Sequence, residues 1–224
     1  MPLILNKISI RKNFLRYLAL FFGLFIIGNG IVFTINADLG VNPWDVLHIG
    51  IAHQTGISIG RVIQGVGLLL VAVSYFFKVR IFIGTLLNMI FLGLFVDLVI
   101  GWGYVPQPDL LWQSILLYVA GVVIFGFGVA VYISANLGAG PRDSLMLALT
   151  KASSYRAGTI RTFMEIAAAA AGFLLGGPLG IGTVIFAITI GFFMELGFTI
   201  IGKIKKTASY ELIWNGARRQ TRGL

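Results

Sequence analysis

Long apolar stretches separated by short polar breaks dominate the hydropathy pattern of this chain. A helix needs about 20 predominantly apolar residues to cross a hydrocarbon core of about 30 Å. Six stretches meet that length, and we predict a membrane-spanning helix in each. They are approximately residues 15–36, 57–77, 81–102, 111–134, 158–177 and 179–201.

A motif, Leu-Gly-x-x-Pro-x-Asp-x-Leu, occurs at residues 39–47 and again, 98 positions later, at 137–145. A repeat at a fixed spacing predicts that the chain consists of two versions of one unit. We expect the first unit over 1–106 and the second over 107–202. The remainder, 203–224, is a basic tail that is either a helix lying on the membrane surface or an unstructured end.

Each copy of the motif leads into an apolar segment that is too short to span. We predict helices over 43–54 and 141–152, and twelve residues rise only about 18 Å. Pro suits the first position of a helix, and Asn42 suits the cap before it. Short apolar helices of this kind are typical of broken or re-entrant elements.

The distribution of charge predicts how the chain is oriented. Only 11% of the residues are charged, 58% are hydrophobic, and the net charge is +9. Lys and Arg concentrate at the two ends, after the second span, and in the connection after the fourth span, which includes Arg142. Cationic loops face the cytoplasm, so both termini are expected there. This role accounts for the positive charge without a nucleic-acid partner, and the expected partner is the lipid bilayer.

The number of spans in each unit determines how the units are related. Three is odd, so the second unit enters the membrane from the side opposite to the first. The predicted fold class is an all-α membrane protein with six transmembrane helices. They form two inverted three-helix repeats, each with a short broken or re-entrant helix after its first span.

Polar residues in the motifs and on the spans are candidates for a substrate pathway. Broken helices near the midplane frame the site in transporters built from inverted repeats, although Asp45 and Asp143 could equally be helix caps. Glu165 is either a proton-coupling carboxylate or a partner of Arg161 one turn earlier. Gln64 and Asn88 either line the pathway or bond neighbouring helices. The full candidate set is Asn42, Pro43, Asp45, Gly140, Pro141, Asp143, Gln64, Asn88 and Glu165.

Four further charges near the ends of spans suggest two ion pairs in equivalent places. We predict the pairs Arg61–Asp97 and Arg161–Glu195, because charges inside a membrane need partners. They would either lock neighbouring helices together or act as gates, one at each face.

Chemistry of other kinds has no support in the sequence. There is no cysteine, and His48 and His53 do not complete the spacing of a metal site. No nucleophile–base set, phosphate loop or dinucleotide fingerprint is present. We therefore expect neither an enzyme, nor a metal, nor a cofactor.

The paired motif, within about 15–201, resembles the YczE/YyaS/YitT family of bacterial integral membrane proteins. The resemblance implies a multi-pass protein of the bacterial cytoplasmic (inner) membrane. The family is mostly uncharacterised, so no functional residue can be carried over. Some members are described as transporter-like, and others resemble accessory proteins for secondary-metabolite production.

Two functions from different classes follow from these patterns. The first is a small secondary transporter or channel for a small solute. The alternative is a non-transporting scaffold that docks a cytoplasmic protein through residues 135–157 and the basic tail. A homodimer is a candidate assembly in either case.

Overall fold

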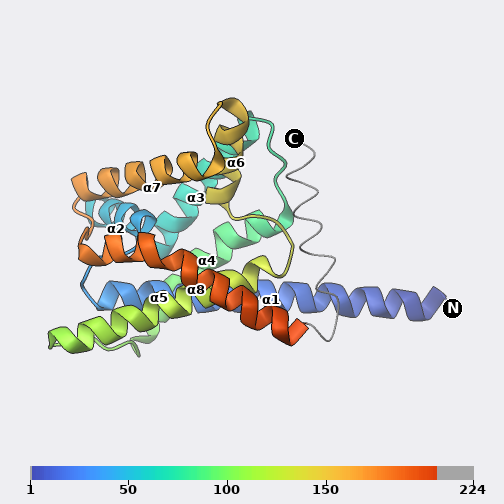
Figure 1. The fold of residues 1–224 in the computed structure, drawn as a ribbon, viewed down its shortest axis with the longest axis horizontal. Helices are drawn as coiled ribbons and strands as arrows, with labels where there is room; N and C mark the ends of the chain where they lie inside the picture. Colours follow the sequence, from blue (N-terminus) through green and yellow to red (C-terminus); the bar gives the residue numbers. More distant parts are fainter. Residues whose placement is uncertain (1, 206–224) are drawn as a thin grey trace.

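The computed structural model describes residues 2–205, with the backbone alone for 2–12, 204 and 205. Every regular element in this part of the chain is an α-helix, as labelled in Figure 1. The predicted surface helix of the tail falls beyond Lys205 and lies outside the described residues. The helices are α1 (Pro2–Asn36), α2 (Pro43–Thr55), α3 (Ile59–Phe76), α4 (Ile83–Trp102), α5 (Leu111–Ile133), α6 (Pro141–Ala152), α7 (Ala157–Leu174) and α8 (Ile181–Lys205).

Five of the described helices are long and apolar enough to cross a membrane. They are α3, α4 and α5, together with Asn13–Asn36 of α1 and Ile181–Lys203 of α8. Helix α7 is not among them, because Arg161 and Glu165 lower the mean hydropathy of its 18 residues. The expected class, an all-α protein with several membrane-spanning helices, is confirmed at this level.

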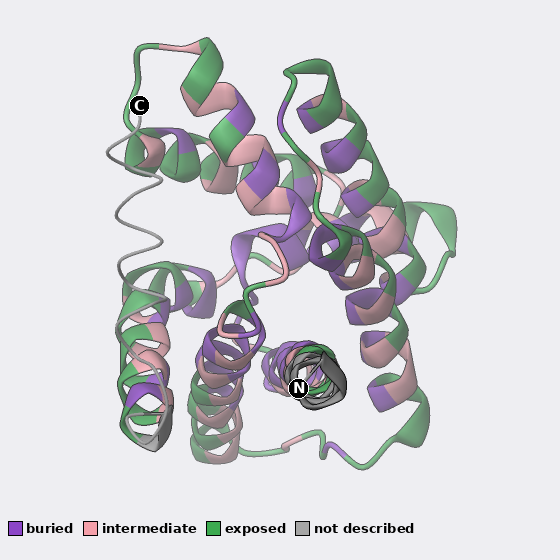
Figure 2. Ribbon diagram, turned by 90° about the vertical axis from the view of Figure 1, so that its right-hand side faces the viewer, coloured by how far each residue is buried: buried purple, intermediate pink, exposed green. Residues whose placement is uncertain are grey.

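Helices α1 and α5 form the centre of the molecule and pack against each other along their length. Helix α4 covers α1, and α8 covers α5. Glycines allow the central pair to approach closely. A methyl group on Gly30 would lie 2.7 Å from the Phe125 nitrogen, and one on Gly128 would lie 2.8 Å from the Ile27 nitrogen. Figure 2 views α1 nearly end-on and shows buried residues gathered between the helices.

The two short helices pack against helices of the opposite half of the chain. Helix α2 lies on α7, and α6 lies on α3. At the first crossing the backbones nearly touch, since a methyl group on Gly50 would lie 2.5 Å from the Gly172 oxygen. The positions 98 residues away from these glycines are Ala148 and Ser74, both with 0% of their surface exposed. Small residues therefore allow both crossings.

The turn that opens each motif is fixed to the other half by a backbone hydrogen bond. The Gly182 nitrogen donates to the Leu39 oxygen at 2.7 Å, and the Gly84 nitrogen donates to the Leu137 oxygen at 3.0 Å. Gly182 and Gly84 belong to the first turns of α8 and α4. The turns are sharp and contain residues with a positive φ angle, a conformation that glycine adopts readily. Gly138, with φ 131°, is one of them. Each motif is thereby positioned by a helix from the other half.

One contact of the first half has no equivalent in the second. Helix α3 packs against α4, where a methyl group on Gly93 would lie 2.2 Å from the Gly60 oxygen. The corresponding glycines, Gly158 and Gly191, have nothing within 4 Å of such a methyl group. Helices α7 and α8 thus lack the close packing that α3 and α4 make, and a cavity borders on both of them.

Candidate functional site

A cavity of about 290 Å³ lies where the first turns of α2 and α6 approach each other. Helices α1, α3, α4, α5, α7 and α8 complete its wall. Most of the lining is apolar and includes Met89, Met146, Met164 and Met194. The polar and charged members are Asn42, Trp44, His48, Asn88, Tyr132, Arg142, Asp143, Arg161 and Glu165.

Local sequence explains why a helix begins beside this cavity at Pro43. The Asn42 side-chain oxygen accepts hydrogen bonds from the Trp44 nitrogen at 2.9 Å and the Asp45 nitrogen at 3.3 Å. Asn42 is extended (φ −62°, ψ 152°), which is the usual backbone of a capping residue. The cap and the proline at the first helical position agree with the sequence prediction.

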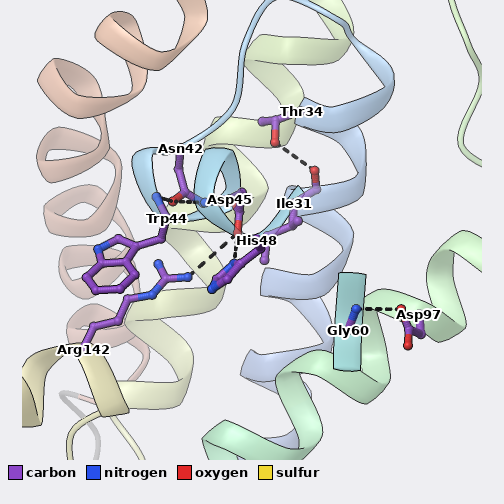
Figure 3. A network of polar contacts seen from close by, with 9 residues as sticks. All are labelled: Ile31, Thr34, Asn42, Trp44, Asp45, His48, Gly60, Asp97 and Arg142. Atoms are coloured by element: carbon purple, nitrogen blue, oxygen red, sulfur yellow. Dashed lines mark hydrogen bonds and ion pairs between the residues drawn. The ribbon is translucent and has the colours of Figure 1, made fainter. Parts of the chain in front are cut away.

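Asp45 is the centre of a buried polar network, shown in Figure 3. None of its surface is exposed. One carboxylate oxygen accepts a hydrogen bond from the Asn42 amide, and the other lies 3.1 Å from His48 Nδ1. An Arg142 nitrogen lies 3.8 Å from that second oxygen and forms an ion pair with it. Because Asp45 and Arg142 belong to different copies of the motif, the network joins the two halves.

Arg142 also stacks on Trp44, its repeat mate 98 positions earlier. The guanidinium carbon lies 5.1 Å from the centre of the indole ring, within the range of a cation–π contact. Arg142 was expected to be one of the cationic residues of a cytoplasmic connection, but it lies in the first turn of a helix and pairs with Asp45. The missed signal is its place inside the motif, between Pro141 and Asp143, at the start of α6.

His48 is a second member of the network that sequence reasoning did not select. It lies outside the five spanning segments, with 1% of its surface exposed. Burial lowers the pKa of the imidazole from the ordinary 6.5, although the hydrogen bond to Asp45 raises it. We therefore expect a neutral ring at pH 7 that donates its Nδ1 hydrogen to the carboxylate. His53 is exposed near the other end of α2.

Asp143 and Asn88 lie at the α6 side of the cavity. The Tyr132 hydroxyl donates to the Asp143 carboxylate at 3.5 Å. Asn88 is 7% exposed, and its amide oxygen lies 3.6 Å from the point that a methyl group on Gly140 would occupy. The cavity thus brings together the sequence candidates Asn42, Pro43, Gly140, Pro141, Asp143, Asn88 and Glu165, with Asp45 directly behind them.

The four charges expected to form two symmetric ion pairs have other positions. Arg161 pairs with Glu165 at 3.0 Å, the alternative partner one helical turn away. Among the described residues, no ion pair joins Arg161 to Glu195 or Arg61 to Asp97. Glu195 is exposed on α8, which does not pack closely against α7.

Asp97 instead serves the start of α3. Its carboxylate accepts hydrogen bonds from the Ser58 hydroxyl at 2.6 Å and from the Gly60 nitrogen at 2.7 Å. The Gly60 nitrogen is a free donor because the first turn of a helix leaves its N–H groups without intrahelical partners. Arg61, the next residue, is exposed. The predicted pair Arg61–Asp97 is therefore wrong, because the carboxylate binds the start of α3 while the guanidinium belongs to an exposed residue.

Gln64 does not border the cavity but bonds neighbouring helices. Its amide nitrogen on α3 donates to the Ile90 oxygen on α4 at 2.8 Å. Gln64→Leu should destabilise the protein by about 1 kcal/mol, the usual worth of such a bond between membrane helices. Any transport or binding activity should remain at the wild-type level. Unfolding in mixed micelles and the activity assay check the two parts, and a loss of activity without a loss of stability would contradict this role.

Apolar helices around a partly charged cavity define a multi-pass membrane protein. The chain belongs to DUF6198, a family of unknown function that matches residues 14–198. It is 37% identical over 184 residues to the uncharacterized membrane protein YczE of Bacillus subtilis, covering 81% of this chain and 84% of the relative.

Two other relatives support the same assignment. An uncharacterized protein of Haemophilus influenzae is 36% identical over 185 residues, covering 83% of this chain and 84% of its own. The uncharacterized protein YyaS of Bacillus subtilis is 26% identical over 193 residues, covering 84% and 94%. The resemblance to YczE and YyaS is therefore confirmed. No solved structure matches the chain.

Proposed function

We propose that the protein is a small secondary transporter or channel, and that its solute passes through the cavity between α2 and α6. The observation that carries this proposal is the ion pair between Asp45 and Arg142, which joins the two motifs beside the cavity. Ionisable groups inside a membrane are costly and are typical of substrate and ion pathways. A scaffold with no pathway would not need five charged side chains in and beside one cavity.

We further propose that the two halves are inverted repeats and that α7 is a sixth span. The exchange of partners supports this relation. Leu39 binds Gly182 while Leu137 binds Gly84; the two leucines are 98 positions apart, and so are the two glycines. A contact and its exchanged copy are expected when two units are related by a two-fold axis. In α7, the charges that lower hydropathy face the cavity and each other.

This arrangement is consistent with a bacterial inner-membrane protein that has both termini in the cytoplasm. The support is the basic N-terminal segment, the basic tail, and the cationic connections on the same side. The proposed role is movement of a solute without covalent chemistry.

Single cysteines in the cavity test this proposal, because the natural chain has no cysteine. Met146→Cys on α6 and Met164→Cys on α7 both place a thiol in the lining. We expect each thiol to react with a membrane-impermeant reagent in right-side-out vesicles and in inverted vesicles, since a pathway must open to both faces. Val46→Cys is the matched control and should stay unreactive from either side, because Val46 is fully buried.

Labelling of Met146→Cys and Met164→Cys from one face only, or from neither face, would contradict a pathway. The scaffold function would then become the better description. It would gain direct support if removal of residues 206–224 abolished function while the helices still inserted.

A further inference from the structure

Donors and acceptors in and beside the cavity are not equally satisfied. Each carboxylate there has a donor within reach. Asp45 is held by Asn42 and His48, Asp143 by the Tyr132 hydroxyl, and Glu165 by Arg161. The Arg142 guanidinium, by contrast, makes an ion pair at 3.8 Å and no hydrogen bond to any described residue. Among the charged groups, the one without a hydrogen bond is therefore a donor.

The start of α6 adds further donors of this kind. In α2 the Asn42 side chain accepts from the nitrogens at 44 and 45. The equivalent cap in α6 is Gly140, which has no side chain to accept from the nitrogens of Arg142 and Asp143. Within residues 2–205, neither nitrogen has a hydrogen-bond partner. An uncapped first turn with its positive dipole favours an anion.

Asn88 points independently to a ligand at the same place. It comes from α4, lines the cavity, and has 7% of its surface exposed. Its side chain makes no hydrogen bond to any part of the described chain, and its amide oxygen lies 3.6 Å from a methyl group placed on Gly140. A buried amide is normally hydrogen-bonded, so an unpartnered amide that opens onto a cavity favours a polar ligand there.

The rest of the cavity wall indicates the chemistry of the rest of the ligand. Four of the five methionines in the chain line the cavity, together with aromatic and aliphatic side chains. Methionine is flexible and polarizable, and it suits apolar ligands of varying shape. The volume, about 290 Å³, is at the small end of ligand pockets.

We infer that the cavity binds a small organic anion with an apolar body. Its anionic group lies at the start of α6, where the Arg142 guanidinium and the amide nitrogen of Asn88 donate to it, and its body contacts the methionines. This inference rests on the proposed function and names the class of its solute. It also gives Arg142 a role, because the guanidinium can keep its ion pair with Asp45 while its free hydrogens bind the anion.

The test is equilibrium binding to the purified full-length protein in nanodiscs by titration calorimetry. The probe is benzoate. Benzylammonium and benzyl alcohol keep the ring but lack the negative charge, and acetate keeps the charge but lacks the ring. We expect saturable binding of benzoate at least about tenfold tighter than that of each of the other three, the difference expected for one or two charged hydrogen bonds or for burial of a ring.

The variant Gly140→Asn tests how much the uncapped first turn of α6 contributes to binding. Gly140 has φ −65° and ψ 169°, close to the φ −62° and ψ 152° of Asn42, so asparagine fits this backbone. The new side chain would accept from the nitrogens of Arg142 and Asp143 and occupy the site of the anion. Benzoate should bind at least about tenfold more weakly. Gly158→Asn, at a position with open space around it, makes the same chemical change and should bind benzoate as the wild type does.

A second variant guards against a folding defect in Gly140→Asn. Asn88→Asp keeps the shape of the side chain and adds a negative charge, so it should also weaken benzoate binding. The inference is overturned if benzoate does not bind, if benzylammonium binds as tightly, or if both variants bind benzoate normally. If the thiols are labelled from both faces but benzoate does not bind, the proposed pathway stands and the inference of an anionic solute fails. If benzoate binds but the thiols are labelled from one face only, the anion site stands and the proposed transport function fails.

Discussion

Replacement of Asp45 with alanine is expected to lower the free energy of unfolding by about 3–5 kcal/mol, the cost of removing one partner from a buried ion pair. The variant leaves the Arg142 guanidinium without its counter-charge, and it removes the acceptor for Asn42 and His48. Because Asp45 has no exposed surface, water cannot replace what is lost. Unfolding in mixed micelles, followed by circular dichroism, measures the change.

The matched control is the repeat mate, Asp143→Ala. Its carboxylate has one contact, to the Tyr132 hydroxyl at 3.5 Å, and it borders the cavity. We expect a loss of about 1 kcal/mol, the usual contribution of one hydrogen bond. Equal losses in the two variants would show that the asymmetric network around Asp45 does not stabilise the protein.

Gly93→Ala is expected to have the second large effect. An added methyl group would lie 2.2 Å from the Gly60 oxygen, so α3 and α4 would have to separate. Overpacking usually costs about 1–3 kcal/mol, and contact with rigid backbone places this variant at or above about 3 kcal/mol. Separation of the two helices would also disturb Asp97, which caps α3 from α4.

Gly191→Ala is the matched control in the second half. A methyl group there meets nothing within 4 Å, so alanine brings only its higher helix propensity. We expect no loss, and a gain of up to about 1 kcal/mol. Both variants are measured in the same unfolding assay. A large loss in Gly191→Ala would show that α7 and α8 pack together in the membrane as α3 and α4 do.

Much of the fold follows from local features of the sequence. Helix positions depend on the length and hydropathy of each stretch, and both can be measured along the chain without knowing its partners. The cap at Asn42 depends on one side chain and the two nitrogens that follow it. The repeated motif drew attention to several residues of the cavity for the same reason, since the repeat is visible in one dimension.

The candidate site was predicted only in part, because its contacts join distant segments. The sequence pointed to Asp45 but not to its partners Arg142 and His48. It placed Gln64 in the pathway, whereas that side chain bonds α3 to α4. It paired Asp97 with Arg61, whereas the carboxylate binds Ser58 and the Gly60 nitrogen. In each case the sequence pointed to a polar residue that makes a specific contact, but it did not give the partner.

The sequence by itself therefore determined an all-helical membrane protein, the places of its helices, its family, and the two motifs around which it is built. The tertiary structure alone decided which charges meet, which motif is capped, and where the halves differ. The physical reason is that hydropathy and helix length are sums over neighbouring residues, while an ion pair depends on helix rotation and crossing. A shift of one residue turns a side chain by about 100°, enough to exchange a partner for lipid.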